Sequence, residues 1–437
     1  MHEADLKHSQ DKIQKKLEQI YALRRTRSKV NWDRTLFVKL LENFGNPHLR
    51  LPPIIHVAGT NGKGSIIAML RAILEAQGLR VHAFTSPHLI DVNERIVLAG
   101  EQIDDAYLEK LIDQALGFID DAPLSFFEVI SAVGFKAFSD QPADILLLEV
   151  GMGGELDCTN IIEKPLVSIV NRISMDHIDF LGNDIKDIAR TKAGIMKAGV
   201  PCVIGYQGEE DMQAVFKEEA KARGASLLTA GRHWGVEKRD GVMVFEIDNK
   251  EHTYSAPNLH GDHQILNAGV VLAALYSISD KIKVDDAAIR TGLQNIHWPA
   301  RMQKLDHTAY GAPEFAEIWL DVGHNDSAAE ALAAQIKCWK NNDDKPVHLI
   351  FALLKTKDAD LFLKPLISLV DGLHIVPISS DINGSQSIDD LSVENVSAHN
   401  SFQNALSHIL EVNTKLRIII AGSMYLAGEV LELDQPV

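Results

Sequence analysis

Short apolar runs alternate with longer amphipathic segments along most of the chain. Several runs are apolar almost without interruption, as expected of strands covered on both faces. This alternation of strand and helix patterns favours the α/β class, with a parallel sheet between helices. The strands expected from these runs lie at 54–57, 80–85, 144–150, 166–170, 201–204, 318–322, 347–353, 373–378 and 416–421.

The segments between these runs carry apolar residues at helical spacing. Residues 207–255 differ, because they are charged and punctuated by glycine, with strand-like pieces such as 242–247 that indicate an antiparallel or meandering edge. A new series of strands and helices begins near residue 298 and has no phosphate loop of its own. Helices are expected at 66–77, 185–197, 258–277, 327–339 and 401–412.

This organisation predicts two domains. The larger, residues 1–297, would be a P-loop nucleotide-binding domain with a mostly parallel sheet, and the smaller, residues 298–437, a Rossmann-like α/β domain. Because ligands of open α/β sheets gather at the carboxyl ends of strands, we expect the site in the cleft between the two domains. The chain shows no internal repeat and no low-complexity tract.

Composition argues against nucleic-acid-binding, membrane-spanning and secreted proteins. Of 437 residues, 60 are acidic and 43 are lysine or arginine, so the net charge of −17 gives no global attraction for nucleic acid. The locally basic stretch from Lys7 to Lys29 is interpreted as a solvated helix face. No apolar run reaches the roughly 18 residues of a membrane span, and no secretory signal pattern opens the chain. Three scattered cysteines suit a reducing compartment, so we expect a cytoplasmic protein without membrane partners.

The turn after the first strand carries the clearest chemical signal. A strand, a glycine-rich turn and a helix N-terminus together make a phosphate-binding loop, since backbone N–H groups can approach anionic oxygens there. Lys63 would meet the β- and γ-phosphates of a nucleotide, and Ser65 would offer its hydroxyl to Mg²⁺. The match to G-x-x-x-x-G-K-[ST] is imperfect, because Val57 replaces the first glycine and Gly64 is inserted, and a turn that binds nothing is the alternative. The candidate nucleotide-binding residues are Gly59, Thr60, Asn61, Gly62, Lys63, Gly64 and Ser65.

The loop also resembles that of the folylpolyglutamate synthases and dihydrofolate synthases, a family within the Mur ligases. Further segments, in matching order and spanning nearly the whole chain, extend the resemblance. Each is weak alone, and together they are specific. They are 85–89 (TSPHL), 126–128 (FFE), 148–154 (LEVGMGG), 156–160 (LDCTN), 175–177 (MDH), 192–195 (KAGI), 321–325 (DVGHN) and 422–423 (GS).

The resemblance implies a metal site around residues that end strands. Glu149 follows a buried strand near the phosphate loop and suits Mg²⁺, although a local cap or salt bridge would explain it too. His177 and Ser86 match metal-binding positions of the family, while the residues alone indicate a structural histidine and a loop serine. Lys192 matches a lysine that is carbamylated in the family, whereas its helical context alone indicates a solvated cation. Thr191 stands where relatives commonly carry Glu.

The resemblance assigns further positions to the nucleotide and the substrates. Asn267, Arg301 and Asp321 match positions that hold the base, the phosphates and the ribose, with an interdomain salt bridge as the alternative for Arg301. His324 and Ser423 are expected near the incoming glutamate. The positions matched near the pterin pocket, where a phenylalanine is equally explained as core, are Phe126, Phe127, Glu128, Leu156 and Asp157.

The implied reaction is ATP-dependent amide ligation. The γ-phosphoryl group passes to a carboxylate of dihydropteroate or a reduced folate, and the α-amino group of L-glutamate then attacks the acyl phosphate. Two Mg²⁺ ions and cationic groups offset the repulsion between a carboxylate and a triphosphate. The family also implies a monomer with small-molecule partners. The residues that would serve this chemistry are Lys63, Glu149, His177, carbamylated Lys192 and His324.

Three alternatives compete with this interpretation. A peptidoglycan Mur ligase would share the chemistry, but it usually has a UDP-binding domain ahead of the loop, and only 58 residues precede Gly59. A P-loop kinase or regulatory NTPase would share Lys63 and Ser65 without the matches in the second half. A silent ATP-binding scaffold would not need intact Lys63, Glu149 and His177.

Two departures from the family pattern bear on which pterin substrate the protein accepts. Residues 28–34 read Ser-Lys-Val-Asn-Trp-Asp-Arg, where relatives often show Ile-Asp-Leu-Gly-Leu-Glu-Arg. Glu155 reverses the charge at a position that is commonly basic. These changes leave addition of the first glutamate, extension of folates, or both as candidate activities, and both together are the expectation, as in many bacterial relatives.

Overall fold

The structure is a computed structural model and describes residues 8–24, 33–119, 122–175, 180, 182–208, 212–411 and 415–433. The chain falls into two compact units. The loop unit, named for the phosphate loop it carries, comprises His8–Asn258 and Asp262–His297. The C-terminal unit comprises Leu259–Gly261 and Trp298–Val437.

Eight strands form the main sheet of the loop unit. In spatial order they are β4 (Glu101–Gln102), β3 (Ile96–Leu98), β2 (Val81–Phe84), β5 (Ile145–Glu149), β1 (Ile54–Ala58), β6 (Val167–Val170), β7 (Pro201–Ile204) and β8 (Ser226–Thr229). The sheet is parallel except at one edge, where β3 pairs antiparallel with β2 and β4. Every residue of β1 and β5 is buried, as their continuous apolar runs predict. Because β1 lies between β5 and β6, the phosphate loop leaves from the middle of the sheet.

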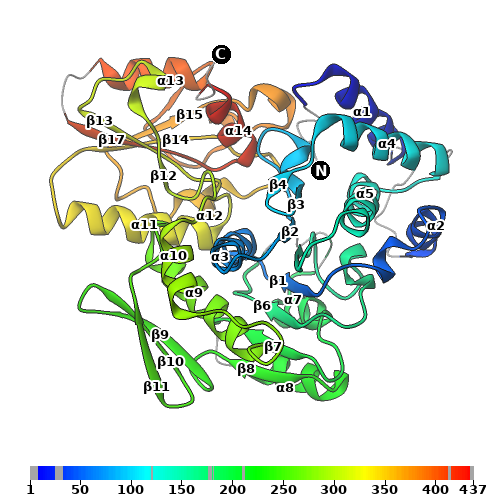
Figure 1. Ribbon diagram of the computed structural model, residues 1–437. Helices are drawn as coiled ribbons and strands as arrows, with labels where there is room; N and C mark the ends of the chain where they lie inside the picture. Colours follow the sequence, from blue (N-terminus) through cyan, green and yellow to red (C-terminus); the bar gives the residue numbers. More distant parts are fainter. Residues whose placement is uncertain are drawn as a thin grey trace. The chain divides into compact units, whose positions relative to one another are not determined.

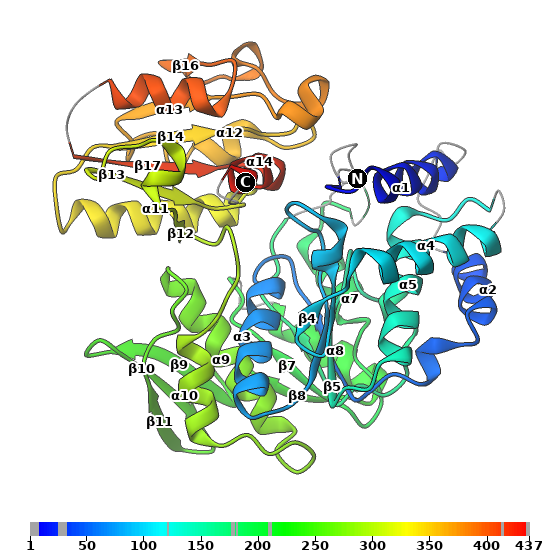
Figure 2. The ribbon, with the colours of Figure 1, turned by 45° about the horizontal axis from the view of Figure 1, so that its top comes forward.

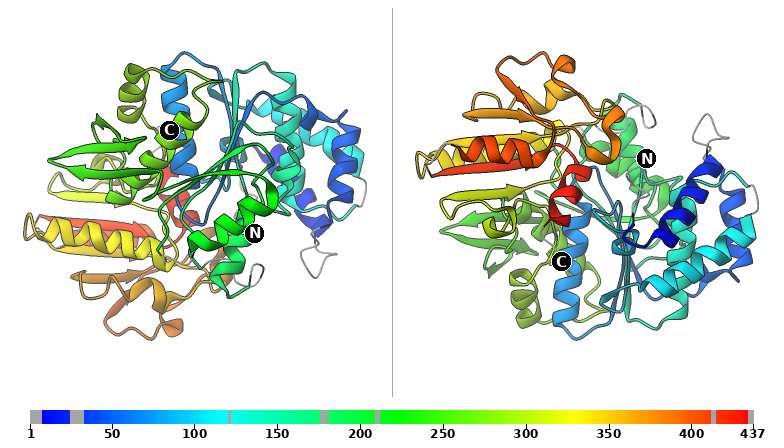
Figure 3. Two further views of the ribbon diagram at one scale, coloured as in Figure 1. Left: turned by 90° about the horizontal axis from the view of Figure 1, so that it is seen from below. Right: turned by 90° about the horizontal axis from the view of Figure 1, so that it is seen from above.

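Helices cover both faces of this sheet, and Figures 1 and 3 show α3 (Lys63–Ala76) and α5 (Phe126–Asp140) on opposite sides of it. α3 begins at Lys63 rather than at residue 66, so the loop runs directly into the helix. It packs against β1, β2 and β5 and against α9 (Asp262–Ser277) and α10 (Asp286–Gln294). The other helices of the unit are α1 (Asp11–Arg24), α2 (Thr35–Asn43), α4 (Asp105–Ile119), α7 (Ile185–Ala193) and α8 (Met212–Arg223).

The described part of the basic N-terminal stretch confirms a solvated helix face. In α1, Lys12 and Lys15 are exposed, while Ile13 and Leu17 are buried. Lys16 lies 2.7 Å from a carboxylate oxygen of Glu109 in α4. The lysines of this helix therefore lie on its solvent side, and its apolar residues hold it against the unit.

The prediction for residues 207–255 is only partly correct. The strand at 242–247 occurs as β10, and it pairs antiparallel with β9 (Trp234–Arg239) and β11 (Lys250–Tyr254). These three strands form a separate sheet instead of an edge of the main sheet, and α8 and β8 were not predicted. β8 has only two apolar residues between Ser226 and Thr229, too few for a recognisable pattern.

α9 begins at Asp262 rather than at residue 258. Gly261 has φ +104°, which is outside the helical region, so the helix cannot extend through it. The three residues before the helix, Leu259–Gly261, belong to the C-terminal unit. Chain connectivity therefore links α9 directly to that unit.

The sheet of the C-terminal unit is parallel apart from one short strand at an edge. In spatial order its strands are β12 (Gln303–Lys304), β13 (Ala316–Leu320), β17 (Leu416–Ala421), β14 (Val347–Phe351), β15 (Gly372–Ile375) and β16 (Val396–Ala398). β12, the antiparallel one, and β16 are too short to be predicted from an apolar run. Figure 2 shows α11 (Asp326–Lys340) and α13 (Phe402–Leu410) on opposite sides of this sheet. The remaining helices are α12 (Ala359–Leu363) and α14 (Met424–Glu432).

Within the described residues, no helix is both long enough and apolar enough to cross a membrane. The three cysteines carry free thiols, two of them buried.

Candidate active site

The phosphate loop combines two glycines in left-handed conformations with a firmly held threonine. Gly59 has φ +150° and Gly62 has φ +82°. The N–H of Thr60 donates to the carbonyl of Arg172 (2.9 Å), and its hydroxyl exchanges hydrogen bonds with the backbone of Ser174 (3.1 Å each). The N–H groups of the first helical turn have no partner within a helix, so the start of α3 attracts anions.

A chain of side-chain amides connects this loop to α9. Asn171, directly after β6, donates from Nδ2 to the carbonyl of Asn61 (3.0 Å) and to Oδ1 of Asn267 (2.9 Å). Asn267 donates in turn to Oε1 of Gln264 (3.0 Å), whose Nε2 lies 3.5 Å from the hydroxyl of Ser65. All three amides are buried, so leaving one of their groups unpaired would cost about 1–3 kcal/mol. Asn267 therefore lies beside the loop and helps to fix it.

Two lysines and one glutamate meet near the carbonyl of Gly59. This oxygen lies 3.2 Å from Nζ of Lys63 and 3.1 Å from Nζ of Lys192. Glu149, which ends β5, places Oε1 3.9 Å from Nζ of Lys63. Lys192 is only 5 % exposed and Glu149 only 3 %, which excludes the solvated cation that the sequence of α7 alone indicated. In such a dry site these charges act strongly on a bound anion.

The oxygen atoms at this site suit a hard divalent cation. Glu149 offers a carboxylate and also accepts a hydrogen bond from the N–H of Ser86 (3.2 Å), so the two residues adjoin. Ser65 and Ser86 offer hydroxyls, and Mg²⁺ prefers such oxygen ligands. His177 lies outside the described residues, as does Asp176 before it. The described residues therefore fit a Mg²⁺ ion, with Glu149 as the charged ligand.

Two of the residues predicted near a pterin are engaged in local caps. Glu128 accepts hydrogen bonds from the N–H (2.7 Å) and the hydroxyl (2.6 Å) of Ser125 and so closes a capping box at the start of α5. Asp157 accepts from the N–H (2.9 Å) and the hydroxyl (2.6 Å) of Thr159. Burial raises the pKa of Asp157 above its usual value, although these donors act in the opposite direction. Both carboxylates therefore hold local backbone, Glu128 at the start of α5 and Asp157 at the 3-10 turn Cys158–Ile161.

Phe127 and Leu156, also predicted near a pterin, differ in their surroundings. Phe127 contacts Gly151, where a Cβ atom would come within 2.3 Å of its ring, so the glycine makes room for the aromatic side chain. Its ring centroid is 6.0 Å from that of Phe84, which ends β2. Leu156 is 45 % exposed, an apolar side chain presented to solvent.

The reversed charge at Glu155 has partners within the loop unit. Its carboxylate forms an ion pair with Arg223 of α8 (2.8 Å), and its backbone carbonyl accepts a hydrogen bond from Arg34. Arg34 also donates to the carbonyl of Leu156 (3.3 Å). Arg223 therefore balances the charge of Glu155, while Arg34 holds the backbone of residues 155 and 156. Of the divergent segment 28–34, the structure describes Asp33 and Arg34 only.

In the C-terminal unit, Asp321 holds the segment that carries Arg301. The neighbours of Arg301 have left-handed backbones, with φ +53° at Ala300 and +45° at Met302. Such conformations cost of the order of 1–3 kcal/mol each and persist only where the surroundings enforce them. Asp321 accepts from the N–H of Met302 (3.0 Å) and from that of Gly323 (2.7 Å), and the N–H of Val322 donates to the carbonyl of Ala300 (3.1 Å). Arg301 thus sits on a strained, fixed turn.

His324 and Ser423 follow two adjacent strands of this sheet. β13 and β17 are parallel neighbours, and the N–H of Gly422 donates to the carbonyl of Gly323 (2.8 Å), which joins the two strand ends. Nδ1 of His324 lies 3.1 Å from the carbonyl of Val322. Ser423 caps α14 by accepting from the N–H of Tyr425 (3.1 Å). Asp321, His324 and Ser423 therefore lie at the carboxyl edge of one sheet, where α/β folds bind ligands.

Sequence reasoning missed the amides of Asn171 and Gln264 and the arginine Arg223. Asn171 directly follows an apolar strand, the same signal that identified Glu149, and it could have been found that way. Gln264 lies one helical turn before Asn267 on α9. Arg223 had no sequence signal, because only the fold brings α8 beside residue 155.

Two known domains together match most of the chain. The Mur ligase middle domain matches residues 57–275, and the dihydrofolate synthetase C-terminal domain matches residues 303–433. The second match favours the folate branch over a peptidoglycan Mur ligase and over a P-loop kinase or NTPase.

Similar proteins cover nearly the whole chain. The dihydrofolate synthase/folylpolyglutamate synthase of Bacillus subtilis is 30 % identical over 411 residues, 90 % of this chain and 92 % of the relative. The structure of E. coli FolC in complex with DHPP and ADP superposes with a TM-score of 0.84 at 26 % identity, covering 96 % of this chain and 97 % of that one. A bifunctional folylpolyglutamate synthase/dihydrofolate synthase with Mn, AMPPNP and L-glutamate bound has a TM-score of 0.81 at 28 % identity, covering 94 % and 96 %.

Replacing Gly62 by alanine should weaken nucleotide binding. The new Cβ would lie 2.4 Å from Nδ2 of Asn171 and 2.6 Å from Oδ1 of Asn267, so it would separate the amides that fix the loop. We expect the dissociation constant for ADP, measured by isothermal titration calorimetry, to rise about tenfold or more, equivalent to about 1.4 kcal/mol.

The matched control is Gly78→Ala. Gly78 has a similar φ, +85°, but open space around its Cβ position, so it reports backbone strain without the clash. Its affinity for ADP should stay at the parent value. ADP binding by Gly62→Ala as tight as by the parent would contradict the role given to the amide chain.

Proposed function

This chain belongs to the dihydrofolate synthase and folylpolyglutamate synthase family of the Mur ligases, and on that premise we propose that it uses ATP to join L-glutamate to a pterin carboxylate. The carboxylate is that of dihydropteroate or of a reduced folate, and both activities are assigned to the one chain. The observation that carries this proposal is the meeting of Lys63, Lys192 and Glu149 at Gly59, in a loop held by buried amides.

In the first step a carboxylate oxygen of the pterin substrate attacks the γ-phosphorus of ATP. The bond between that phosphorus and the β,γ-bridging oxygen breaks, giving an acyl phosphate and ADP. Lys63 and the N–H groups at the start of α3 neutralise the phosphate oxygens as the two anions approach. Asn267 lies on the same amide chain and is assigned to the base.

In the second step the α-amino nitrogen of L-glutamate attacks the acyl carbon. Phosphate leaves with the carboxylate oxygen, the nitrogen loses a proton, and an amide remains. His324 and Ser423 are assigned to glutamate, while Arg301 and Asp321 are assigned to the γ-phosphate and ribose of the nucleotide. The fixed turn at Arg301 supports this assignment, because a preorganised guanidinium loses little entropy on binding phosphate.

Divalent metal belongs to this chemistry, and bound Mg²⁺ would offset the charge of the triphosphate. We assign two ions to Ser65, Ser86, Glu149, His177 and Lys192. The pterin pocket is assigned to Phe127, Glu128, Leu156 and Asp157, with Arg34 supplying positive charge beside Leu156. We further propose that the protein acts as a cytoplasmic monomer with small-molecule partners only.

For Lys192 to bind a cation it must first lose its own positive charge. Attack of the neutral Nζ amine on CO₂ forms an N–C bond and releases one proton, leaving a carbamate with two oxygens. The burial of Lys192 and its position beside Gly59 support this modification. A carbamate at Lys192 would supply ligand oxygens next to Glu149 and Lys63.

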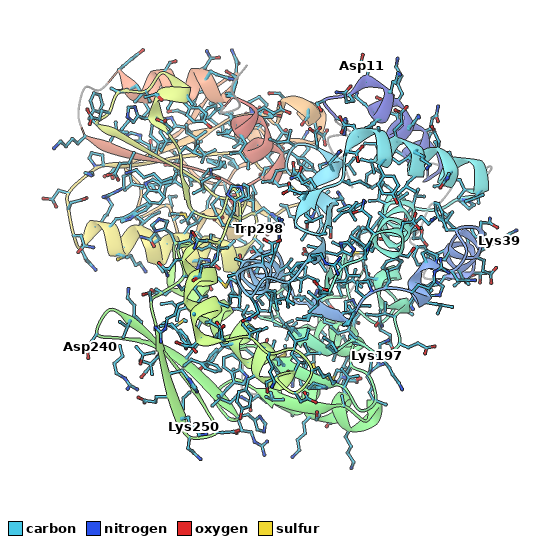
Figure 4. All side chains as sticks on the ribbon, in the orientation of Figure 1. Asp11, Lys39, Lys197, Asp240, Lys250 and Trp298 are labelled. Carbon is cyan, nitrogen blue, oxygen red and sulfur yellow. The ribbon has the colours of Figure 1, made fainter. Side chains whose placement is uncertain are left out.

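Purified protein should hydrolyse ATP only when both L-glutamate and a pterin are present. Dihydropteroate and tetrahydrofolate, offered separately, each should support ADP release. Lys63→Ala should lower kcat by about 10²- to 10³-fold, because a cation facing the transferring phosphoryl group is lost. The control is Lys39→Ala, since Lys39 points outward from α2 (Figure 4) and should leave the rate unchanged. Hydrolysis that ignores both pterins would overturn the folate assignment.

The carbamate predicts dependence on CO₂. With ¹³C-bicarbonate, the protein should show a carbamate resonance in its ¹³C spectrum that Lys192→Arg lacks, and that variant should lose about 10²-fold or more in kcat. The control is Lys197→Arg, because burial lowers the pKa of Lys197 and makes it a competing amine. A resonance that persists in Lys192→Arg and disappears in Lys197→Arg would place the carbamate elsewhere.

A further inference from the structure

Four histidines line up in the C-terminal unit, none of them a residue of the candidate active site. They come from neighbouring elements and form what we call the histidine row: His348 of β14, His374 of β15, His399 just after β16, and His408 of α13. The order β14-β15-β16 is also the spatial order of these strands. The row therefore runs diagonally across the edge of the sheet under α13.

Ring nitrogens connect three members of the row. Nδ1 of His348 lies 3.1 Å from Nε2 of His374, and Nδ1 of His374 lies 3.1 Å from Nε2 of His399. Gly372 makes room for the first contact, because a Cβ atom there would lie 2.4 Å from Nδ1 of His348 and 2.9 Å from Nε2 of His374. The absence of a side chain at Gly372 is what lets these two rings approach.

His374, His399 and His408 form a nearly regular triangle of rings. The centroids of His374 and His399 are 5.3 Å apart, those of His399 and His408 are 5.3 Å apart, and those of His374 and His408 are 6.1 Å apart. Three imidazoles bound to one tetrahedral Zn²⁺ at about 2.0–2.1 Å have ring centroids about 5 Å apart. The triangle therefore has the dimensions of a three-histidine metal site.

We propose that His374, His399 and His408 bind one divalent transition-metal ion of the zinc type, with His348 as the orienting partner of His374. As they stand, no three His, Cys, Asp or Glu side chains among the described residues are placed to hold a metal ion, so binding requires the ring of His408 to turn toward the other two. Its side chain is 56 % exposed, so solvent rather than packed protein surrounds much of the ring. With Nδ1 of His374 on the metal, its Nε2–H donates to Nδ1 of His348, and a hydrogen bond donated by the second ring nitrogen is what orients a metal-bound imidazole.

The electrostatics of the row suit a soft or borderline cation. Burial lowers the pKa of His374 to about 4, and burial also lowers the pKa of His348 and His399, so these rings are neutral at neutral pH and present lone pairs. Two acids lie near the row: Glu411, 3.9 Å from Nδ1 of His408, and Asp371, whose charge acts on His348. Imidazole ligands favour Zn²⁺, Ni²⁺ and Cu²⁺ over Mg²⁺, so this site would not compete for the magnesium of the active site.

Metal here would fasten β16, the short strand at the edge of the sheet, to β15 and α13. The test is a zinc titration of metal-stripped full-length protein in saturating Mg²⁺, followed by calorimetry and by elemental analysis of bound zinc. We expect one zinc per chain more than in His399→Gln/His408→Gln, a higher thermal midpoint with zinc in the parent only, and intense tetrahedral Co²⁺ absorption that the double variant lacks.

The control is His252→Gln, an exposed histidine on β11 of the loop unit, which should bind as much zinc as the parent. Near-ultraviolet circular dichroism of the metal-free proteins confirms that each variant is folded. Equal zinc content and equal Co²⁺ spectra in the parent and the double variant would overturn the proposal.

Discussion

The candidate site depends on the contact between Gly62 and two buried asparagines. A strand in the middle of the sheet must turn into α3 within a few residues, and Gly62 allows this because its φ of +82° is open to glycine. Asn171 and Asn267 occupy the space that any side chain at Gly62 would need. Their amides hold the loop carbonyl and each other, so the N–H groups of the loop stay aimed before a ligand arrives. Preorganisation of this kind is what makes a phosphate site effective.

The same principle recurs in the C-terminal unit with different chemistry. Asp321 accepts N–H groups from both sides of a turn and so enforces two left-handed residues around Arg301. In the loop unit, Glu155 would be an unbalanced charge without Arg223. In both units a charged side chain holds backbone or balances another charge. A neighbouring residue remains available to contact a ligand.

The sequence predicted the long buried strands because they are continuous apolar runs, and it placed Glu149 at the end of one of them for the same reason. Asp321 was assigned from the resemblance. It placed Lys192 on a helix but, without the resemblance, on the wrong side of it, because burial depends on packing of α7 that a short periodic pattern does not encode. Five short strands, β3, β4, β8, β12 and β16, were missed because so few residues offer no periodicity. Arg223 and the histidine row depend on contacts between distant segments, which single-sequence patterns do not carry. His177, predicted to bind metal, lies outside the described residues.

The acyl phosphate is the centre of the proposed mechanism, and isotope transfer tests it most directly. Dihydropteroate labelled with ¹⁸O in its carboxylate would be converted in the presence of ATP and L-glutamate, and the inorganic phosphate analysed by mass spectrometry. The account predicts one ¹⁸O atom in each phosphate released, because phosphate leaves with the oxygen that attacked the γ-phosphorus. Phosphate without ¹⁸O, formed at the same rate as the amide, would contradict it.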